Sequence, residues 1–404
     1  MNKNALEGVK IADFSWVWAG PLATLLLSFL GAEVIKIESR KRVDQIRYSS
    51  ITTGDSYNDY DASPIFNNAN LNKKSVSLDL KKSKGVELAK RIVAESDVVL
   101  ENMRPGVMDR LGLSYNDLVK VKPDIIMLSS SGFGATGPYS KYAGYAPIFA
   151  SFGGLAYLTG YEDGEPNTMS GVIDMRVGTI TAFVLLTALI HKQKTGEGQY
   201  IDLSSSECMS AQVGSELMEY TMNRRSPHRC GNQDSIMAPH NCYRCKGEDK
   251  WISIAVATEE EWKALCKAMG NPEWTKERAF SDGYSRWNNR AKLDKLISEW
   301  TMKYTHYDIM TMLQDVGVAA TPSLSAEEIL SDPHVNARGL VTEVEHPVMG
   351  KKKVISPPWK LSETPANIWK ASPVLGENNK EIFGSLLGMS EKEIEKLVDE
   401  GVIY

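Results

Sequence analysis

The fold is decided by residues 9–38, VKIADFSWVWAGPLATLLLSFLGAEVIKIE. VKIADF (9–14) is short and apolar, which is typical of a buried strand. LATLLLSFLG (22–31) has the length of a helix and ends at Gly31, a residue suited to close one. AEVIKIE (32–38) reads as a second strand. A strand, a helix and a strand in this order predict a parallel pair joined by a crossover helix.

The same alternation continues along the chain. Further strands are predicted at 75–80, 97–102 and 124–134, with an amphipathic helix at 83–96. This pattern predicts an α/β fold with a Rossmann-like large domain, built on a parallel, doubly wound sheet. Ligands of such sheets bind at the carboxyl ends of the strands.

Composition narrows the classes of function. The 404 residues are too many for one ordinary core, so a smaller mixed domain is expected after the polar segment 223–241. The net charge of −5 mixes both signs, which argues against partners such as nucleic acid or a membrane surface. MNKNALEGVK lacks the apolar core of a signal peptide, and the apolar runs are too short to cross a bilayer. The five cysteines form no disulfide framework in so long a chain, so we expect a cytoplasmic protein.

The glycine-rich stretch GFGATG (132–137) has the spacing of a dinucleotide-binding turn. Its context does not fit, because Pro138 follows at once and no acid stands at the end of a second strand. We expect instead a tight turn in which the backbone approaches a ligand.

Histidines and cysteines gather between residues 228 and 245. Zinc binds such side chains, but their spacing is irregular, so no metal site is predicted. Cys242 and Cys245 are expected to lie on one face of a strand as small buried hydrophobes. The members of this group are His228, Cys230, His240, Cys242 and Cys245.

Asp174 is the only acid in the stretch GVIDMRVGTITAFVLLTALI (171–190). The ordinary interpretation is a helix cap, because aspartate is among the best N-cap residues and a helix is expected to begin directly after it. The alternative is chemistry. A helix N-terminus stabilises the ionised carboxylate, and apolar flanks would leave it poorly hydrated and more nucleophilic. The residues alone leave both interpretations open.

Nine phrases in a fixed order decide between them. They are LEGVKIADFSWVWAGP, GAEVIKIES, NKKSVSLDL, DVVLENMRPGVMDRLGLSY, SSSGFGATGPYSKYAGY, the block from GVIDM to TGEGQYIDLS, HNCYRCKGEDKWISIAV, DPHVNARG and WKLSETP. Over nearly its whole length the chain thereby resembles the family III CoA-transferases, the group of formyl-CoA:oxalate, carnitine and benzylsuccinate CoA-transferases.

The resemblance implies a mechanism. Asp174 matches the family's catalytic aspartate, whose carboxylate attacks an acyl-CoA thioester to give a mixed anhydride. The released thiolate then forms an aspartyl-CoA thioester, from which a second carboxylic acid takes the CoA. The implied partners are an acyl-CoA, such as succinyl-CoA, and a free acid. Coenzyme A enters as a substrate, and no tightly bound cofactor or metal is needed.

The resemblance also implies a CoA site at the strand ends. Four of its positions, Lys73, Lys74, Arg104 and Arg110, are cations where phosphates would bind. The implied lining residues are Trp18, Ala19, Ser39, Leu71, Asn72, Lys73, Lys74, Asn102, Met103, Arg104, Arg110, Ser130, Ser131, Gly132 and Phe133. GNQD (231–234) lies near a family glycine loop that can cover the site.

The implied assembly is a dimer of interlocked rings, either a homodimer or a heterodimer with a paralogous subunit. The large domain starts with residues 1–222, the small domain and its linkers occupy 223–325, and the segment 326–404 returns to the large domain.

The chain departs from the family pattern at several positions. Ser39 and Ser131 stand where some members carry basic side chains, and Trp18 replaces a polar residue of the formyl/oxalate branch. Together with Trp16, this favours a bulky or aromatic acid over oxalate.

Two other functions are compatible with the resemblance. An α-methylacyl-CoA racemase shares the fold, but it pairs the aspartate with a histidine, and the matching phrase here reads Gly144-Tyr145-Ala146. Racemisation needs two acid/base groups. The second alternative is one subunit of a hetero-oligomeric CoA-transferase.

Overall fold

The structure is a computed structural model that describes residues 4–48, 60–169 and 171–404. The chain divides into two compact units. The first comprises Met1–Ala156, Thr168–Ser226 and His334–Tyr404. The second comprises Tyr157–Asn167 and Pro227–Pro333.

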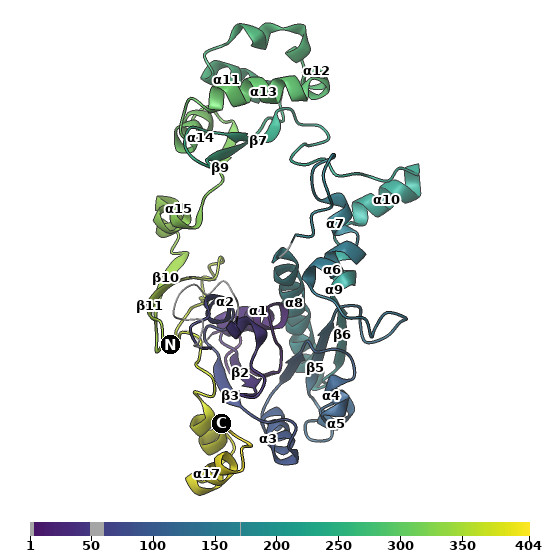
Figure 1. Ribbon diagram of the computed structural model, residues 1–404, viewed down its shortest axis with the longest axis vertical. Coiled ribbons are helices and arrows are strands. Elements are labelled where there is room, and N and C mark those ends of the chain that lie inside the picture. The colour runs from purple at the N-terminus through teal and green to yellow at the C-terminus, as the bar shows by residue number, and fades with distance from the viewer. Residues whose placement is uncertain (1–3, 49–59, 170) are drawn as a thin grey trace. The chain divides into compact units, whose positions relative to one another are not determined.

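The first unit is built on a six-stranded sheet in the order β3-β2-β1-β4-β5-β6, and all neighbours pair in parallel (Figure 1). This confirms the predicted α/β fold, and the order is that of doubly wound nucleotide-binding sheets. The strands are β1 (Lys10–Asp13), β2 (Glu33–Glu38), β3 (Lys74–Ser77), β4 (Val98–Glu101), β5 (Ile126–Ser131) and β6 (Tyr200–Ser204).

Helices cover both faces of the sheet. Helices α1 (Ala19–Phe29) and α8 (Val172–Thr195) pack on one face and α3 (Ser83–Ala94) on the other. The other helices of this part of the chain are α2 (Pro64–Ala69), α4 (Val107–Arg110), α5 (Tyr115–Leu118), α6 (Ala146–Phe152), α7 (Leu155–Leu158), α9 (Ser205–Ser210) and α10 (Gly214–Asn223).

Alternate strand residues supply two separate cores. Ile11 in β1 packs with α1 and α8, whereas its neighbour Ala12 packs on the opposite face with α3. Val98 and Val99 in β4 divide in the same way. Because side chains alternate along a strand, a run of apolar residues buries both faces, which explains why these strands read as continuously hydrophobic.

Helix α8 is pressed closely against α1. A Cβ atom added to Gly178 would lie 2.7 Å from the carbonyl oxygen of Ala19. By length and composition α8 could span a membrane, contrary to the expectation that no segment is long enough. In this structure one face of α8 packs in the first core, where it contacts α1 and β5, while Phe183 and Ile190 on the helix are exposed.

The C-terminal segment completes the edge of the sheet at β3. The side-chain oxygens of Asn378 and Asn379 accept hydrogen bonds from the N–H groups of Ser75 and Ser77, both at 3.0 Å. These bonds replace a neighbouring strand and protect an edge that would otherwise be open to pairing. The segment contains α16 (Pro333–Ala337), β10 (Val341–His346), β11 (Gly350–Ile355), a π-helix η5 (Lys380–Leu386) and α17 (Glu391–Asp399).

The second unit has a three-stranded antiparallel sheet in the order β7-β8-β9. Its elements are β7 (His240–Arg244), β8 (Trp251–Ala255), α11 (Glu259–Ala268), α12 (Gly283–Asn288), α13 (Arg290–Thr301), α14 (His306–Gln314), β9 (Ala319–Pro322) and α15 (Ala326–Ser331).

The prediction that Cys242 and Cys245 share one face of a strand is wrong. Cys245 is buried in the core of the second unit, whereas Cys242 is half-buried and lines a cavity with Ser323. A separation of three residues places side chains on opposite faces of extended chain. All five cysteines are free.

Replacing Gly178 tests the contact between α1 and α8. Alanine favours a helix over glycine by about 1 kcal/mol, but its methyl group must push α1 away, at a cost of about 1–3 kcal/mol. We expect Gly178→Ala to lower the free energy of unfolding, measured by urea denaturation. Gly214→Ala is the control, because nothing lies within 4 Å of a Cβ added there. A Gly178→Ala protein as stable as the wild type would contradict this packing.

Candidate active site

The candidate site lies where the order of the sheet changes direction, between β1 and β4. In doubly wound sheets ligands bind in the crevice that opens beyond the carboxyl ends of the strands at this point. The loop after β1 contains Trp16, Val17 and Trp18, and the loop after β4 contains Asn102 and Arg104. The loops after β1 and β4 therefore lie at the edge of the sheet where a ligand is expected to bind.

Side chains from other parts of the first unit hold three consecutive residues of the loop after β1. The side chain of Asn102 accepts a hydrogen bond from the backbone N–H of Trp16 and donates one to its carbonyl oxygen, both at 2.7 Å. Lys36 donates to the carbonyl oxygen of Ser15 at 2.8 Å, and Asp44 accepts from the N–H of Val17 at 2.9 Å. Four separate side-chain contacts thus hold three consecutive residues in one geometry.

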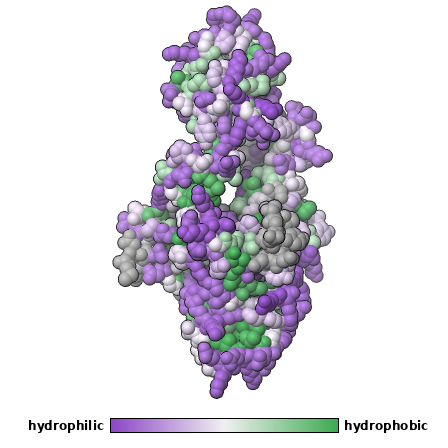
Figure 2. Space-filling model, turned by 60° about the vertical axis from the view of Figure 1, so that its left-hand side comes forward, coloured by the Kyte–Doolittle hydropathy of each residue, from purple (hydrophilic) through white to green (hydrophobic). Residues whose placement is uncertain are grey.

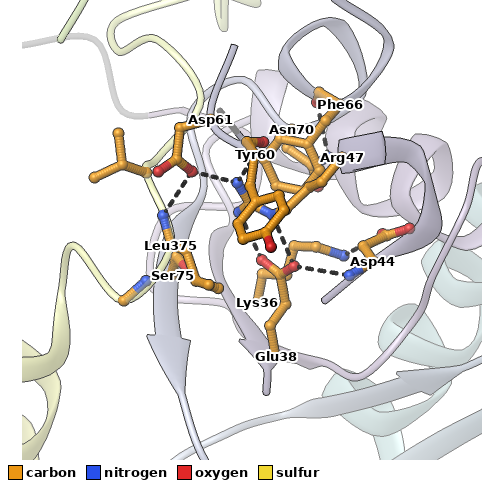
Figure 3. A network of polar contacts seen from close by, with 12 residues as sticks. Lys36, Glu38, Asp44, Arg47, Tyr60, Asp61, Phe66, Asn70, Ser75 and Leu375 are labelled. Atoms are coloured by element: carbon orange, nitrogen blue, oxygen red, sulfur yellow. Dashed lines mark hydrogen bonds and ion pairs between the residues drawn. The ribbon is translucent and has the colours of Figure 1, made fainter. Parts of the chain in front are cut away.

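Buried ion pairs lie next to this loop. Figure 3 shows Lys36 beside Asp44, and Glu38 beside Arg47. Lys36 and Asp44 are 3.2 Å apart, and Arg47 and Glu38 2.8 Å apart. Burial alone would lower the pKa of Lys36, but the carboxylates of Asp44 and Glu38 outweigh it and raise that pKa. The ammonium group therefore stays charged, and buried charges of this kind persist only when they are paired.

Val17 adopts a left-handed backbone conformation with φ of 65°. A β-branched residue is strained there, and such strain persists only where the surroundings enforce it. The hydrogen bond from Val17 to Asp44 is one of those constraints. The strained residue lies in the wall of a cavity, directly before Trp18.

The cavity has a volume of about 530 Å³. It is formed by the loops after β1, β4 and β5, together with the starts of four helices. Its lining residues are Val17, Trp18, Ala19, Asn102, Met103, Arg104, Pro105, Ser130, Ser131, Gly132, Ser140, Tyr142, Gly144, Tyr145, Ala146, Pro147, Phe149, Gly171, Asp174 and Ser205.

Asp174 reaches the cavity from the first turn of α8. The helix starts at Val172 with Gly171 as its N-cap, so Asp174 is the third helical residue and the expectation that it caps the helix is wrong. Burial raises the pKa of Asp174 to about 6, and no hydrogen bond or ion pair from the described residues offsets that burial. Around neutral pH the group is mostly an ionised, poorly solvated carboxylate, which is the state of an activated nucleophile.

Helix N-termini face the same cavity. Ala19 opens α1, of 11 residues, and Gly171 caps α8, of 24 residues. The starts of the shorter helices α6 and α9 also line it. Unsatisfied N–H groups and the helix dipole make such ends favourable places for negative charge. The cavity therefore suits the carboxylate of Asp174 and any oxyanion that develops beside it.

Eight of the predicted CoA-lining residues share this cavity with Asp174. They are Trp18, Ala19, Asn102, Met103, Arg104, Ser130, Ser131 and Gly132. Ser131 is buried, and its hydroxyl has no hydrogen-bond partner in the described part of the chain. Phe133 lies next to the cavity and packs edge-on against Phe149, with ring centroids 5.6 Å apart.

The other predicted residues lie elsewhere. Lys73 is fully buried and pairs with Asp13 at 3.2 Å, and burial lowers its pKa to about 8. Asn72 holds the C-terminal segment by accepting from the N–H groups of Trp369 and Lys370. The remainder do not line the cavity: Leu71 is buried in another cluster, Lys74 pairs with Glu33 and Glu381, Ser39 is half-buried after β2, and Arg110 is exposed after β4.

Sequence reasoning missed the aromatic part of the cavity wall. Tyr142, Tyr145 and Phe149 line it, and they follow the glycine turn in YSKYAGYAPIF (139–149). The turn itself is as expected, since Gly134 and Gly137 have φ of 82° and 86°. The density of aromatic residues directly after it was the signal that could have identified this wall.

The described residues contain no group of three or more histidines, cysteines, aspartates or glutamates able to hold a metal ion. Of the five histidines and cysteines between residues 228 and 245, Cys245 is in the core and Cys230 is exposed in the 223–241 segment. Asp174 is the only carboxylate among the described residues that line the cavity, and serine and tyrosine hydroxyl groups lie in the same wall.

The comparisons with known proteins agree with one another, and each of them covers most of the chain. Residues 6–379 match the family described as CoA-transferase family III. The succinyl-CoA–D-citramalate CoA-transferase of Chloroflexus aurantiacus is 34% identical, with 98% of each chain covered. The beta subunit of the succinyl-CoA–L-malate CoA-transferase from that organism is 31% identical, again with 98% of each chain covered. A crystal structure of a CAIB/BAIF family protein from Brucella suis superposes with a TM-score of 0.86 and 31% identity, covering 95% of this chain and all of the other.

The raised pKa of Asp174 predicts a cost in stability. Between its ordinary value of 3.8 and about 6, the folded protein binds more protons than the unfolded chain, so the free energy of unfolding falls as pH rises through this window. We expect Asp174→Asn to melt at a higher temperature than the wild type at about pH 8, and at the same temperature below about pH 4.

Differential scanning calorimetry across this pH range measures the effect. Asp163→Asn is the matched control, because Asp163 is an exposed aspartate and its replacement should give no pH-dependent difference. An Asp174→Asn protein that melts below the wild type at about pH 8 would show that the carboxylate is stabilised rather than desolvated.

Proposed function

Because the chain belongs to CoA-transferase family III, we propose that it moves CoA from succinyl-CoA to a free carboxylic acid through covalent intermediates on Asp174. The observation that carries the proposal is the position of Asp174, a desolvated carboxylate in a cavity lined by helix N-termini. Succinyl-CoA is proposed as the donor because both relatives described above are named for it.

The reaction proceeds in two exchanges. A carboxylate oxygen of Asp174 attacks the thioester carbonyl, the C–S bond breaks, and a mixed anhydride and CoA thiolate result. The thiolate attacks the aspartyl carbonyl of the anhydride, which releases succinate and leaves an aspartyl-CoA thioester. The acceptor carboxylate then attacks this thioester, and the expelled thiolate takes the acceptor acyl group. Asp174 returns to its ionised form, and no net proton is consumed.

The residues around Asp174 suit these steps. Each attack places negative charge on a carbonyl oxygen, and the N–H groups at the starts of α1 and α8 can stabilise it. The free hydroxyl of Ser131 is a further donor. Arg104, exposed at the rim, suits a phosphate of CoA, and Trp18, Ala19, Asn102 and Met103 are proposed to contact the pantetheine arm.

We propose a bulky or aromatic acid as the acceptor. Trp18, Tyr142, Tyr145 and Phe149 supply an aromatic wall on the same cavity as Asp174. Aromatic rings of a ligand gain from edge-on and offset contacts with such a wall. The only cation among the described lining residues is Arg104, so the second carboxylate of a short diacid would have few partners there.

The assembly is proposed to be a dimer of interlocked chains, formed with a second copy or with a paralogous subunit as in the malate enzyme named above. Helix α10 supports an oligomer, because none of its residues is buried and Leu217, Met218 and Met222 are exposed. Figure 2 shows hydrophobic residues gathered in separate patches on a mainly hydrophilic face. Unburied apolar helices of this kind commonly face a partner. A cytoplasmic location belongs to the same proposal.

The racemase alternative has less support. Racemisation needs one acid/base group on each side of the substrate carbon. Among the described residues that line the cavity, Asp174 is the only carboxyl group and there is no histidine. A transferase needs only the single nucleophile.

The covalent intermediate gives a direct test. On mixing with succinyl-CoA, the intact mass of the protein should rise by a CoA adduct, and addition of an acceptor acid should remove it. Asp174→Asn should form no adduct, while Asp163→Asn should behave as the wild type. An adduct on the Asp174→Asn protein, or deuterium uptake at the α-carbon without any adduct, would contradict the proposed mechanism.

The acceptor is tested with a panel of acids. We expect 3-phenylpropionate to discharge the adduct faster than oxalate, and Tyr145→Ala to slow the aromatic acid about threefold or more, the loss of roughly one aromatic contact. Tyr145 is 66% exposed, so its replacement should leave the fold intact. Tyr284→Ala, at 78% exposure on the second unit, is the control. Preference for oxalate would disprove the assignment of an aromatic acceptor.

A further inference from the structure

Exposed arginines lie on both sides of the switch point. Arg40 and Arg42 follow β2, and Arg104 and Arg110 follow β4. None of the four forms an ion pair with any residue that the structure describes. Lys41, between the first two, instead pairs with Asp79 at 2.8 Å. Within the part of the chain that the structure describes, this edge of the sheet therefore presents guanidinium groups without a carboxylate partner, at the place where an extended anionic ligand would lie.

Arg42 differs from the other three because its position is fixed. A tight turn from Ser39 to Arg42, closed by a 3.0 Å backbone hydrogen bond, brings the side chain back toward the sheet. The guanidinium carbon lies 5.0 Å from the ring centre of Trp16, a cation–π contact. Trp16 is itself held at both backbone polar groups by Asn102, a residue of the cavity wall. A short chain of contacts thus connects Arg42 to the cavity of Asp174.

The end of the second strand has a defined role in sheets of this order. An acid there binds a ribose hydroxyl, whereas a nearby arginine accommodates a phosphate on that ribose. The acid in this position is Glu38, but both of its carboxylate oxygens are taken by Arg47, at 2.9 and 2.8 Å. With Glu38 occupied and Arg42 free, this edge selects a ribose that carries a phosphate.

Coenzyme A has such a phosphate at the 3′ position of its ribose. With the thioester beside Asp174, the nucleotide end of CoA must extend out of the cavity along the strand ends. We infer that Arg42, stacked on Trp16, binds the 3′-phosphate of CoA and makes the enzyme discriminate against CoA that lacks it. The inference rests on the proposed function and assigns the nucleotide end of that site.

Binding measurements with two ligands test it. Calorimetric titration of the full chain with CoA and with 3′-dephospho-CoA isolates the contribution of one phosphate. A charge-assisted contact of this kind is expected to favour CoA about ten- to a hundredfold in the wild type. Arg42→Ala should reduce that preference to about threefold or less, by weakening CoA and not 3′-dephospho-CoA. Arg42→Lys should retain part of it, because lysine keeps the charge but not the planar fork.

Two matched variants locate the effect. Arg40→Ala removes the same charge two residues away without a stacked ring, and Arg110→Ala removes a charge on the opposite side of the switch point. Both should keep the preference for CoA. Equal binding of both ligands by the wild type, or loss of the preference in one of these two variants but not in Arg42→Ala, would overturn the inference. The CoA adduct on Asp174 is scored separately, so a transferase without 3′-phosphate selectivity would leave the proposed function intact.

Discussion

The structure of the site depends on buried ion pairs beneath the loop that follows β1. Lys36 connects Asp44 to the carbonyl oxygen of Ser15, and Asp44 in turn holds the N–H of Val17. Removing one member of such a pair would leave an uncompensated charge in the core, which is far more costly than the net gain from forming the pair. The arrangement thus gives little net stability, but it allows one geometry for the loop. The strained conformation of Val17, the direction of Trp18 and the start of α1 all follow from it.

Different interactions hold the two sides of the cavity that contains Asp174. On one side, polar groups fix the loops after β1 and β4, through Asn102 and the ion pairs. On the other, close packing at Gly178 fixes the start of α8 and with it Asp174. Burial raises the pKa of Asp174, whereas the helix end favours its ionised form. The environment of the carboxylate is therefore unfavourable to its ionised form, and the stability of the surrounding framework offsets this cost.

Much of this framework could be predicted from the sequence. Short apolar strands alternating with helices specify a parallel sheet. The nine sequence phrases along the chain singled out Asp174 as the candidate catalytic residue. The position of the cations along their strands was harder to predict. Lys73 directly precedes β3 and pairs with the buried Asp13, whereas Arg104 follows β4 and lines the cavity. In a parallel sheet the start of one strand and the end of another lie at opposite edges, so Lys73 does not share the edge of Arg104. The aromatic wall after Gly132 was missed because Tyr142 lies outside any helix or strand, and because α6, which contains Phe149 and is capped by Tyr145, has only seven residues and was not predicted.

The asparagines that close the edge of β3 have a consequence for biosynthesis. Asn378 is 303 residues from Ser75, its partner, so the first strands of the chain leave the ribosome long before their edge can be completed. A nascent chain of this protein exposes an unpaired parallel edge during most of its synthesis, and such edges are prone to pair with other chains. Contacts of this sequence separation also make folding slow. The chain is thus expected to rely on chaperones until its last residues are made, and truncation near residue 376 would affect the first strands of the sheet rather than the C-terminus alone.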